Sequence, residues 1–159
     1  MIAVADTSPV CYLILIGEIE LLPRLFSQVL LPEAVVLELL HHDAPGEVRG
    51  WASNLPPWVR IEETAVPATS GLETLQAGEQ AAIVVAESCS ADIILLDEKA
   101  ARRIAAARGL RVTGLLGVLG EAATRGLLEL APAINQLRTT NFRSSPALLK
   151  ATLDRFGGR

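Results

Sequence analysis

Two apolar runs that each end in an acidic residue constrain the fold of this chain more than any other feature. The first is Ile2–Ala5, followed by Asp6, and the second is Ile93–Leu96, followed by Asp97. Short apolar runs of this kind are typical of buried strands. After Asp6, the pair Ser8-Pro9 predicts a helix start, with the serine as N-cap and the proline at the first helical position. Both acids are therefore expected at the carboxyl ends of strands, the edge where open parallel α/β sheets bind ligands.

The rest of the chain alternates between strand patterns and helix patterns. Further strands are predicted at Val29–Leu31, Trp58–Ile61 and Arg111–Thr113. Helices are predicted at Val10–Ile16, Glu18–Phe26, Pro32–Leu40, Gly46–Leu55, Glu79–Ser88, Glu98–Arg108, Leu115–Arg125, Pro132–Leu137 and Pro146–Phe156. Strands separated by helices of about ten residues imply βαβ crossovers and a parallel sheet. The predicted fold class is α/β.

The length of 159 residues suits one domain, residues 1–159, with a helical C-terminal tail from about residue 115 packed on it. No apolar run approaches the roughly 20 residues that span a bilayer. The start of the chain lacks the basic region of a secretion signal, so we expect a soluble, cytoplasmic protein without a membrane partner. Cys11 and Cys89 have no second ligand at a metal-binding spacing, and we expect reduced thiols in the core.

The formal net charge of −4 argues against nucleic-acid binding by bulk charge alone. It does not exclude a nuclease. Several acids in one metal site would make the total negative and leave a basic rim elsewhere.

Four acids stand where an otherwise apolar pattern gives no reason for them. Asp6 and Asp97 follow strands, Glu38 interrupts the apolar helix at residues 32–40, and Glu79 follows Gly78 in the first turn of a helix. Each has an ordinary explanation, because Glu79 could complement a helix dipole and Glu38 could lie on a solvated face. Together they predict an acidic cluster at the carboxyl edge of the sheet.

A divalent cation would stabilise such a cluster. Two carboxylates about 4 Å apart repel by roughly 4 kcal/mol at an effective dielectric of 20, so they would protonate, separate or bind a cation. Oxygen ligands without His or Cys favour Mg²⁺ or Mn²⁺. These ions can polarise a phosphodiester and activate a water, so the implied chemistry is phosphodiester hydrolysis. Thr7 and Ser8 could support an acid or a water by hydrogen bonding, or could serve only to cap the helix.

The ordered set of motifs resembles the PIN-domain family over essentially the whole chain. The residues that carry the resemblance are Asp6-Thr7-Ser8-Pro9, Pro32-Glu33-Ala34-Val35 leading to Glu38, Gly78-Glu79, Leu95-Leu96-Asp97-Glu98 with Ala101-Arg102-Arg103, and Val112–Leu119. The likeness is greatest to small prokaryotic proteins related to VapC-type toxins.

The resemblance implies a three-layer α/β/α sandwich with a central parallel sheet and an acidic pocket that binds Mg²⁺ or Mn²⁺ and cleaves single-stranded RNA. It implies that Asp6, Glu38, Glu79 and Asp97 are the catalytic and metal-binding acids. Glu98 stands where relatives often carry Asp, and its extra methylene makes it a weaker candidate ligand.

The resemblance also implies partners. VapC-like toxins form homodimers and are inhibited by a small antitoxin protein. The apolar helices at residues 10–16 and 115–119 suggest surplus apolar surface for such contacts. Lys99, Arg102 and Arg103, which follow Asp97 on one predicted helix, could bind the phosphates of the substrate or could form an ordinary solvated face. His41 and His42 are expected in a surface loop without a role.

Two other functions compete with a nuclease. A non-catalytic PIN-like module with a degenerate acidic site would hold nucleic acid or a protein partner. Glu98, which stands where relatives often carry Asp, keeps this alternative open. A phosphotransfer receiver also gathers acids at strand ends. However, Val112-Thr113-Gly114 stands where a receiver would need Lys, and the middle strand lacks an acceptor Asp.

Overall fold

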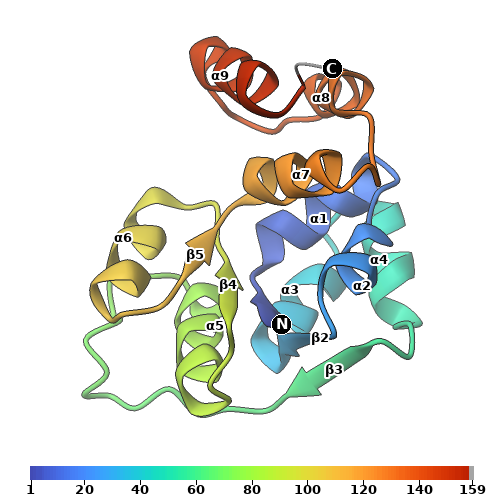
Figure 1. Ribbon diagram of the computed structural model, residues 1–159. Helices are drawn as coiled ribbons and strands as arrows, with labels where there is room; N and C mark the ends of the chain where they lie inside the picture. The colour runs from blue at the N-terminus through green and yellow to red at the C-terminus, as the bar shows by residue number, and fades with distance from the viewer. Residues whose placement is uncertain (158–159) are drawn as a thin grey trace.

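The structure, a computed structural model that describes residues 1–157, contains one sheet of five parallel strands. The strands are β1 (Ile2–Ala5), β2 (Gln28–Pro32), β3 (Val59–Glu62), β4 (Ile93–Leu95) and β5 (Val112–Thr113). Their order across the sheet is β3-β2-β1-β4-β5, and every neighbouring pair is parallel. Parallel neighbours require crossover connections, and helices supply them. The predicted α/β class and parallel sheet are therefore confirmed (Figure 1).

The helices within the described residues are α1 (Thr7–Leu15), α2 (Leu21–Leu25), α3 (Glu33–Leu40), α4 (Gly46–Ser53), α5 (Ala77–Ser88), α6 (Lys99–Ala107), α7 (Leu115–Thr124), α8 (Leu130–Arg138) and α9 (Pro146–Phe156). None of the helices in the described part of the chain is long and apolar enough to cross a membrane.

The sheet is buried on both faces because successive side chains of a strand point to opposite sides. In β1, Ala3 and Ala5 belong to one apolar core with α1, α3 and α7, whereas Val4 belongs to a second core with α5 and α6. Figure 1 shows α5 and α6 on one side of the sheet and α1 to α4 on the other. These three layers form the α/β/α sandwich that the resemblance implied.

The topology brings two acids to one edge of the sheet. The chain builds β2 and β3 outward from one side of β1 and then crosses back to place β4 and β5 on the other side. Strand order therefore reverses between β1 and β4, the position where α/β sheets form ligand crevices. Asp6 directly follows β1, and Asp97 follows β4 after Leu96.

Helix α1 begins earlier than the sequence suggested. Its N-cap is Asp6 and its first residue is Thr7, so Ser8 is not the cap and Pro9 is the third helical residue. The backbone N–H of Asp6 still bonds to the carbonyl of Leu95 at 3.1 Å, so the chain turns from strand to helix without an intervening loop. Pro9 fits because the first-turn N–H groups have no partner within a helix.

The C-terminal helices cover apolar surface that the sequence assigned to partners. Val10 and Leu13 of α1, and Leu115 and Leu119 of α7, are fully buried in the first core. Helix α9 packs on α7, where the ring of Phe156 lies so close to Gly120 that it leaves no room for a Cβ at that position. These side chains of α1 and α7 are therefore internal, whereas Leu15, Ile16 and Leu116 are half-buried and pack against the same core.

Candidate active site

A pocket of about 790 Å³ is lined by all five acids that the sequence predicted. Asp6 and Asp97 come from strand ends, Glu38 from α3, Glu79 from α5, and Glu98 precedes α6. The structure thus brings together side chains from residues 6 to 98 of the chain. How each one is held decides what the pocket can do.

Asp6 is the most deeply placed acid, with 5% of its surface exposed. The pKa of its carboxyl group is raised from 3.8 to about 7, first by burial and then by the negative charges of Glu79, Glu38 and Asp97. The backbone N–H of Thr7 partly offsets this increase. Near neutral pH, Asp6 therefore gains strongly from any positive charge that enters the pocket.

Glu38 is held by two donors from other elements. The Thr7 hydroxyl donates to its Oε2, and the Gly78 backbone N–H donates to its Oε1 at 3.0 Å. A Cβ on residue 78 would lie 2.6 Å from that same Oε1, so only glycine allows this approach. The sequence motif Gly78-Glu79 therefore has a physical reason, because the glycine makes room for Glu38.

Glu79 lies in the first turn of α5 and is 8% exposed. Its Oε1 accepts a hydrogen bond from the backbone N–H of Gln76 at 3.0 Å, and the Gln76 side chain completes a capping box. Burial, together with the charges of Glu98 and Glu38, raises the pKa of Glu79. One oxygen of Glu79 thus serves the start of α5, and the same residue still lines the acidic pocket.

Asp97 has one satisfied oxygen and one without a partner. Its Oδ1 accepts from the backbone N–H of Leu115 at 2.8 Å, whereas its Oδ2 is buried and has no hydrogen-bond partner among the described residues. Burial raises the pKa of Asp97, and the Leu115 N–H and the Arg102 guanidinium partly lower it. An unpartnered buried carboxylate oxygen is costly in a folded protein and is suited to a cation.

The weaker candidates have different positions. Glu98 is exposed at the rim, where it caps α6 by accepting from the N–H of Ala100 at 3.5 Å. Ser8 lines the pocket beside Thr7. Lys99 and Arg102 line a second, neighbouring pocket, and Arg103 is exposed and lines neither.

The sequence analysis did not single out several residues of the pocket, among them Tyr12, Asn141, Phe142 and Arg143. The Tyr12 hydroxyl donates to Oδ1 of Asn141 at 2.8 Å, and the Tyr12 and Phe142 rings meet edge to face at 5.2 Å. In the sequence, the one signal for this part of the pocket was an aromatic residue beside a basic one in Asn141-Phe142-Arg143. Nothing local connects that segment with Tyr12, about 130 residues earlier.

Cys11 also lines this pocket and is half-buried rather than in the core. Burial raises the pKa of its thiol, so the thiol stays protonated at neutral pH.

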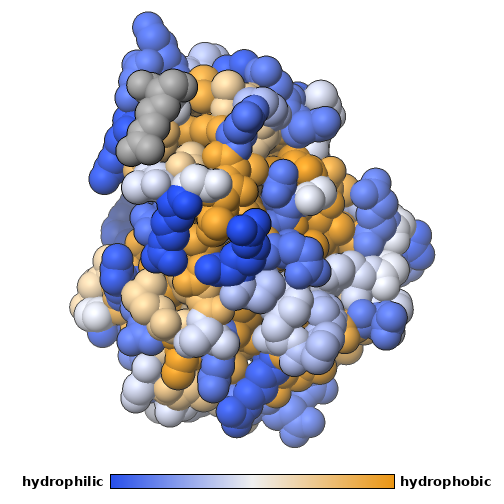
Figure 2. Space-filling view, turned by 45° about the vertical axis from the view of Figure 1, so that its right-hand side comes forward, coloured by the Kyte–Doolittle hydropathy of each residue, from blue (hydrophilic) through white to orange (hydrophobic). Residues whose placement is uncertain are grey.

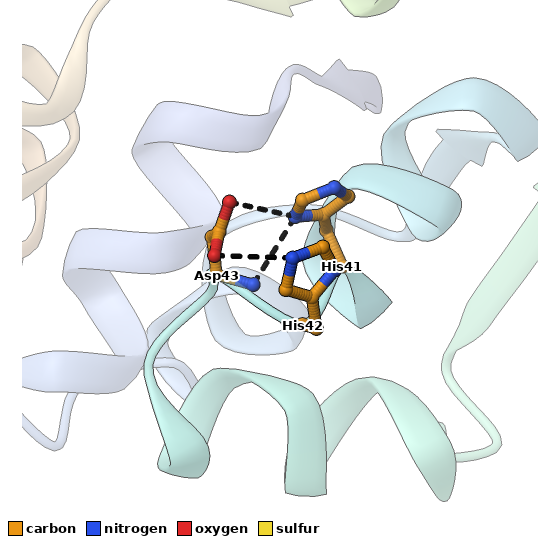
Figure 3. A group of neighbouring side chains, drawn as sticks. All are labelled: His41, His42 and Asp43. Carbon is orange, nitrogen blue, oxygen red and sulfur yellow. Dashed lines mark hydrogen bonds and ion pairs between the residues drawn. The ribbon is translucent and has the colours of Figure 1, made fainter.

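A second group of ligand-type side chains lies outside the acidic pocket. His41, His42 and Asp43, at the end of α3, form the one group of three or more within the described residues whose ligand atoms all lie within 4.8 Å (Figure 3). All three are exposed, and Nδ1 of His41 already accepts the backbone N–H of Asp43 at 3.1 Å. The expected surface loop is confirmed.

The acidic pocket suits a divalent cation by its chemistry. Its carboxylates are more widely spread than the histidine group, because no three of them among the described residues have ligand atoms that all lie within 4.8 Å. Asp6, Glu79 and Asp97 all have raised pKa values, and Asp97 offers an oxygen without a partner. Hard oxygen donors of this kind select Mg²⁺ or Mn²⁺.

The comparison with protein families agrees with the fold and the pocket. A family model described as a PIN domain matches residues 2–158, nearly the whole chain. No curated protein and no solved structure shows significant similarity to it. PIN domains are generally nucleases and typically use divalent metal ions. With a model match of this extent, the chain belongs to the PIN-domain family.

Proposed function

We propose that this protein is a metal-dependent endoribonuclease that hydrolyses phosphodiester bonds of single-stranded RNA. The observation that carries the proposal is the convergence of Asp6, Glu38, Glu79 and Asp97 on one pocket at the strand-order reversal. These four acids would hold Mg²⁺ or Mn²⁺, with Glu98 as a weaker contributor from the rim. A bound ion would supply stabilisation of the negative charge that develops on the phosphoryl oxygens.

The protein's own groups fix the acids before any ligand binds. Thr7 and Gly78 orient Glu38, Gln76 orients Glu79, and Leu115 orients Asp97. Partners of this kind typically contribute about 10–100-fold in metal affinity or activity. Pre-orientation supports catalysis, because the ligands need little reorganisation when the substrate arrives.

The test is cleavage of a mixed pool of single-stranded RNA by purified protein with Mg²⁺ or Mn²⁺, compared with an EDTA control. We expect wild type to cleave and Asp6→Asn to lose activity while keeping its circular-dichroism spectrum. Asp43→Asn makes the same chemical change on the exposed surface and serves as the matched control. Metal-dependent cleavage that persists in Asp6→Asn would refute the assignment.

The alternative is a non-catalytic PIN-like module. It predicts no cleavage with either metal from protein free of copurified partner. It also predicts no Mn²⁺ binding above non-specific levels by calorimetry. These two results together would replace the nuclease proposal.

We further propose a VapC-like cytoplasmic role, with a homodimer and a small inhibitory antitoxin as partners. Exposed apolar side chains support a protein partner: Leu37 and Leu40 on α3, and Ile61 on the edge strand β3. Figure 2 shows apolar side chains gathered in the upper half of the face it presents, between charged side chains. Expression of a toxin would arrest bacterial growth, and expression of Asp6→Asn would not. Growth that continues at high levels of active wild type would exclude the toxin role.

A further inference from the structure

A second pocket of about 670 Å³ lies beside the acidic one. It is built from α6, α7 and α9, and it shares Asp97, Phe142 and Arg143 with the acidic pocket. The two pockets therefore meet at these three residues. A chain-like ligand with a phosphate at the acids would extend into the second pocket.

The charge of the second pocket is opposite to that of the first. Its lining includes Lys99, Arg102, Arg143 and Arg155, against Asp97 as its acid. None of these four cations forms an ion pair within the described residues. Arg102 donates to the carbonyl of Leu96 at 3.0 Å, and the Arg155 guanidinium lies 4.8 Å from the Phe156 ring centre. Cations without carboxylate partners are the groups that bind phosphates.

The junction is placed by the connection between α8 and α9. Thr140 donates from its hydroxyl to the carbonyl of Leu137 at 2.6 Å, and Ser145 caps α9 by accepting from Leu148 N–H at 3.0 Å. Between these anchors, Tyr12 holds Asn141 and packs against Phe142. Arg143 follows these two anchored residues in the chain, and its side chain is exposed. The two half-buried rings offer an aromatic surface next to the acids, as strand-binding proteins use for bases.

Helix α9 presents one face to the second pocket. Leu148, Ala151, Thr152 and Arg155 line it, at the i, i+3, i+4, i+7 spacing of a single helix face. Lys150 lies on the same helix but does not line the pocket. Lys150 is therefore a basic residue of α9 that lies outside the pocket. A comparison of Lys150 with Arg155 tests the role of Arg155.

We propose that the second pocket binds the phosphodiester backbone of single-stranded RNA on one side of the cleavage point. Lys99, Arg143 and Arg155 contact phosphates, and Phe142 stacks on a base at the junction. This inference rests on the proposed function, because it assigns the path of the substrate that the acids would cut. It also assigns a task to the C-terminal helices.

The experiment measures binding of a fluorescent single-stranded RNA of about 12 nucleotides by anisotropy, in the Asp6→Asn background so that the RNA stays intact. We expect Arg143→Gln and Arg155→Gln each to weaken binding by about tenfold, the size of one charge-assisted hydrogen bond. Each should also lower the slope of log K against log salt by about 0.7, because one phosphate contact is lost. Lys150→Gln removes the same charge from α9 and should change neither quantity.

Folding is checked by thermal unfolding, and Arg143→Lys should recover part of the salt slope because it restores the charge. If Lys150→Gln and Arg155→Gln behave alike, α9 contributes only diffuse charge and the inference fails. If Asp6→Asn protein binds no RNA, the inference fails as well.

A kinetic readout separates the inference from the nuclease proposal. In the otherwise wild-type protein, Arg155→Gln should raise KM for RNA and leave kcat nearly unchanged, because Arg155 lies in the second pocket and not in the acidic one. Cleavage with an unchanged KM would refute the RNA path and keep the nuclease. Binding with the expected salt slopes but no cleavage under any metal would refute the nuclease and keep the RNA path.

Discussion

The acidic pocket and the His41-His42-Asp43 group both gather side chains that could bind a metal, and they differ in how those side chains are brought together. The acids come from separate elements between residues 6 and 98, and Asp6 and Glu79 are buried. The histidine group consists of three consecutive exposed residues, and His42 Nε2 lies 3.3 Å from Asp43 Oδ1 (Figure 3).

Proximity alone therefore does not identify a site. The histidine contacts follow from sequence adjacency, and water can solvate each group in place of a metal. In the acidic pocket, the fold maintains repulsion between carboxylates and supplies donors to Asp6, Glu38, Glu79 and Asp97. A buried arrangement that costs stability indicates function more strongly than an exposed one that costs nothing.

The largest effect is expected from Gly78→Ala, which places a Cβ where the backbone of residue 78 approaches Glu38 in the acidic pocket. A Cβ at this position would lie 2.6 Å from Glu38 Oε1 and would displace that carboxylate. We expect RNA cleavage to fall by more than the roughly 100-fold upper range for supporting groups around a metal.

Gly50→Ala in α4 is the matched control, because a Cβ there meets nothing within 4 Å. This change should leave cleavage intact and stabilise the helix by about 0.5–1 kcal/mol. Gly78→Ala protein that cleaves like wild type would show that the position of Glu38 does not matter.

The second prediction concerns stability and pH in metal-free protein. The pKa of Asp6 is raised from 3.8 to about 7, so between these values the folded state binds more protons than the unfolded state. The free energy of unfolding therefore falls as pH rises through this range. Asp6→Asn removes the free-energy cost of ionising this buried carboxyl group. Near pH 8 it should stabilise the metal-free protein by up to about 4 kcal/mol, given 1.36 kcal/mol per pKa unit.

Urea unfolding in EDTA near pH 8 and near pH 4 measures this difference, which should fall below about 1 kcal/mol at the lower pH. Asp43→Asn on the exposed loop should shift stability by less than about 0.5 kcal/mol at either pH. A destabilised Asp6→Asn protein near pH 8 would contradict the sign of the argument.

The smallest effect is expected from the double change His41→Ala and His42→Ala. Both side chains are exposed and their polar contacts are to Asp43, so the free energy of unfolding should change by no more than about 0.5 kcal/mol. Cleavage and the Mn²⁺ affinity from calorimetry should match wild type. Loss of Mn²⁺ binding in this variant would move the metal centre from the acids to the histidines.

The sequence alone determined the class of the fold and the set of acids. Apolar strands ending in Asp6 and Asp97, helices between them, and glycine before Glu79 are local patterns. They depend on interactions within a few residues, and a parallel sheet then places both strand ends at one edge. Local patterns were less reliable for boundaries, since α1 begins at Thr7 and not after Ser8.

Only the tertiary structure decided which groups surround those acids. The contact of Gly78 with Glu38 joins positions 40 residues apart, and Tyr12 meets Asn141 across 129 residues. The tertiary structure also decided which basic side chains lie near the acids, because Arg102 lines the second pocket and the adjacent Arg103 does not. Helix periodicity fixes directions only within one element, whereas the pockets depend on how separate elements pack, and packing is a property of the whole chain.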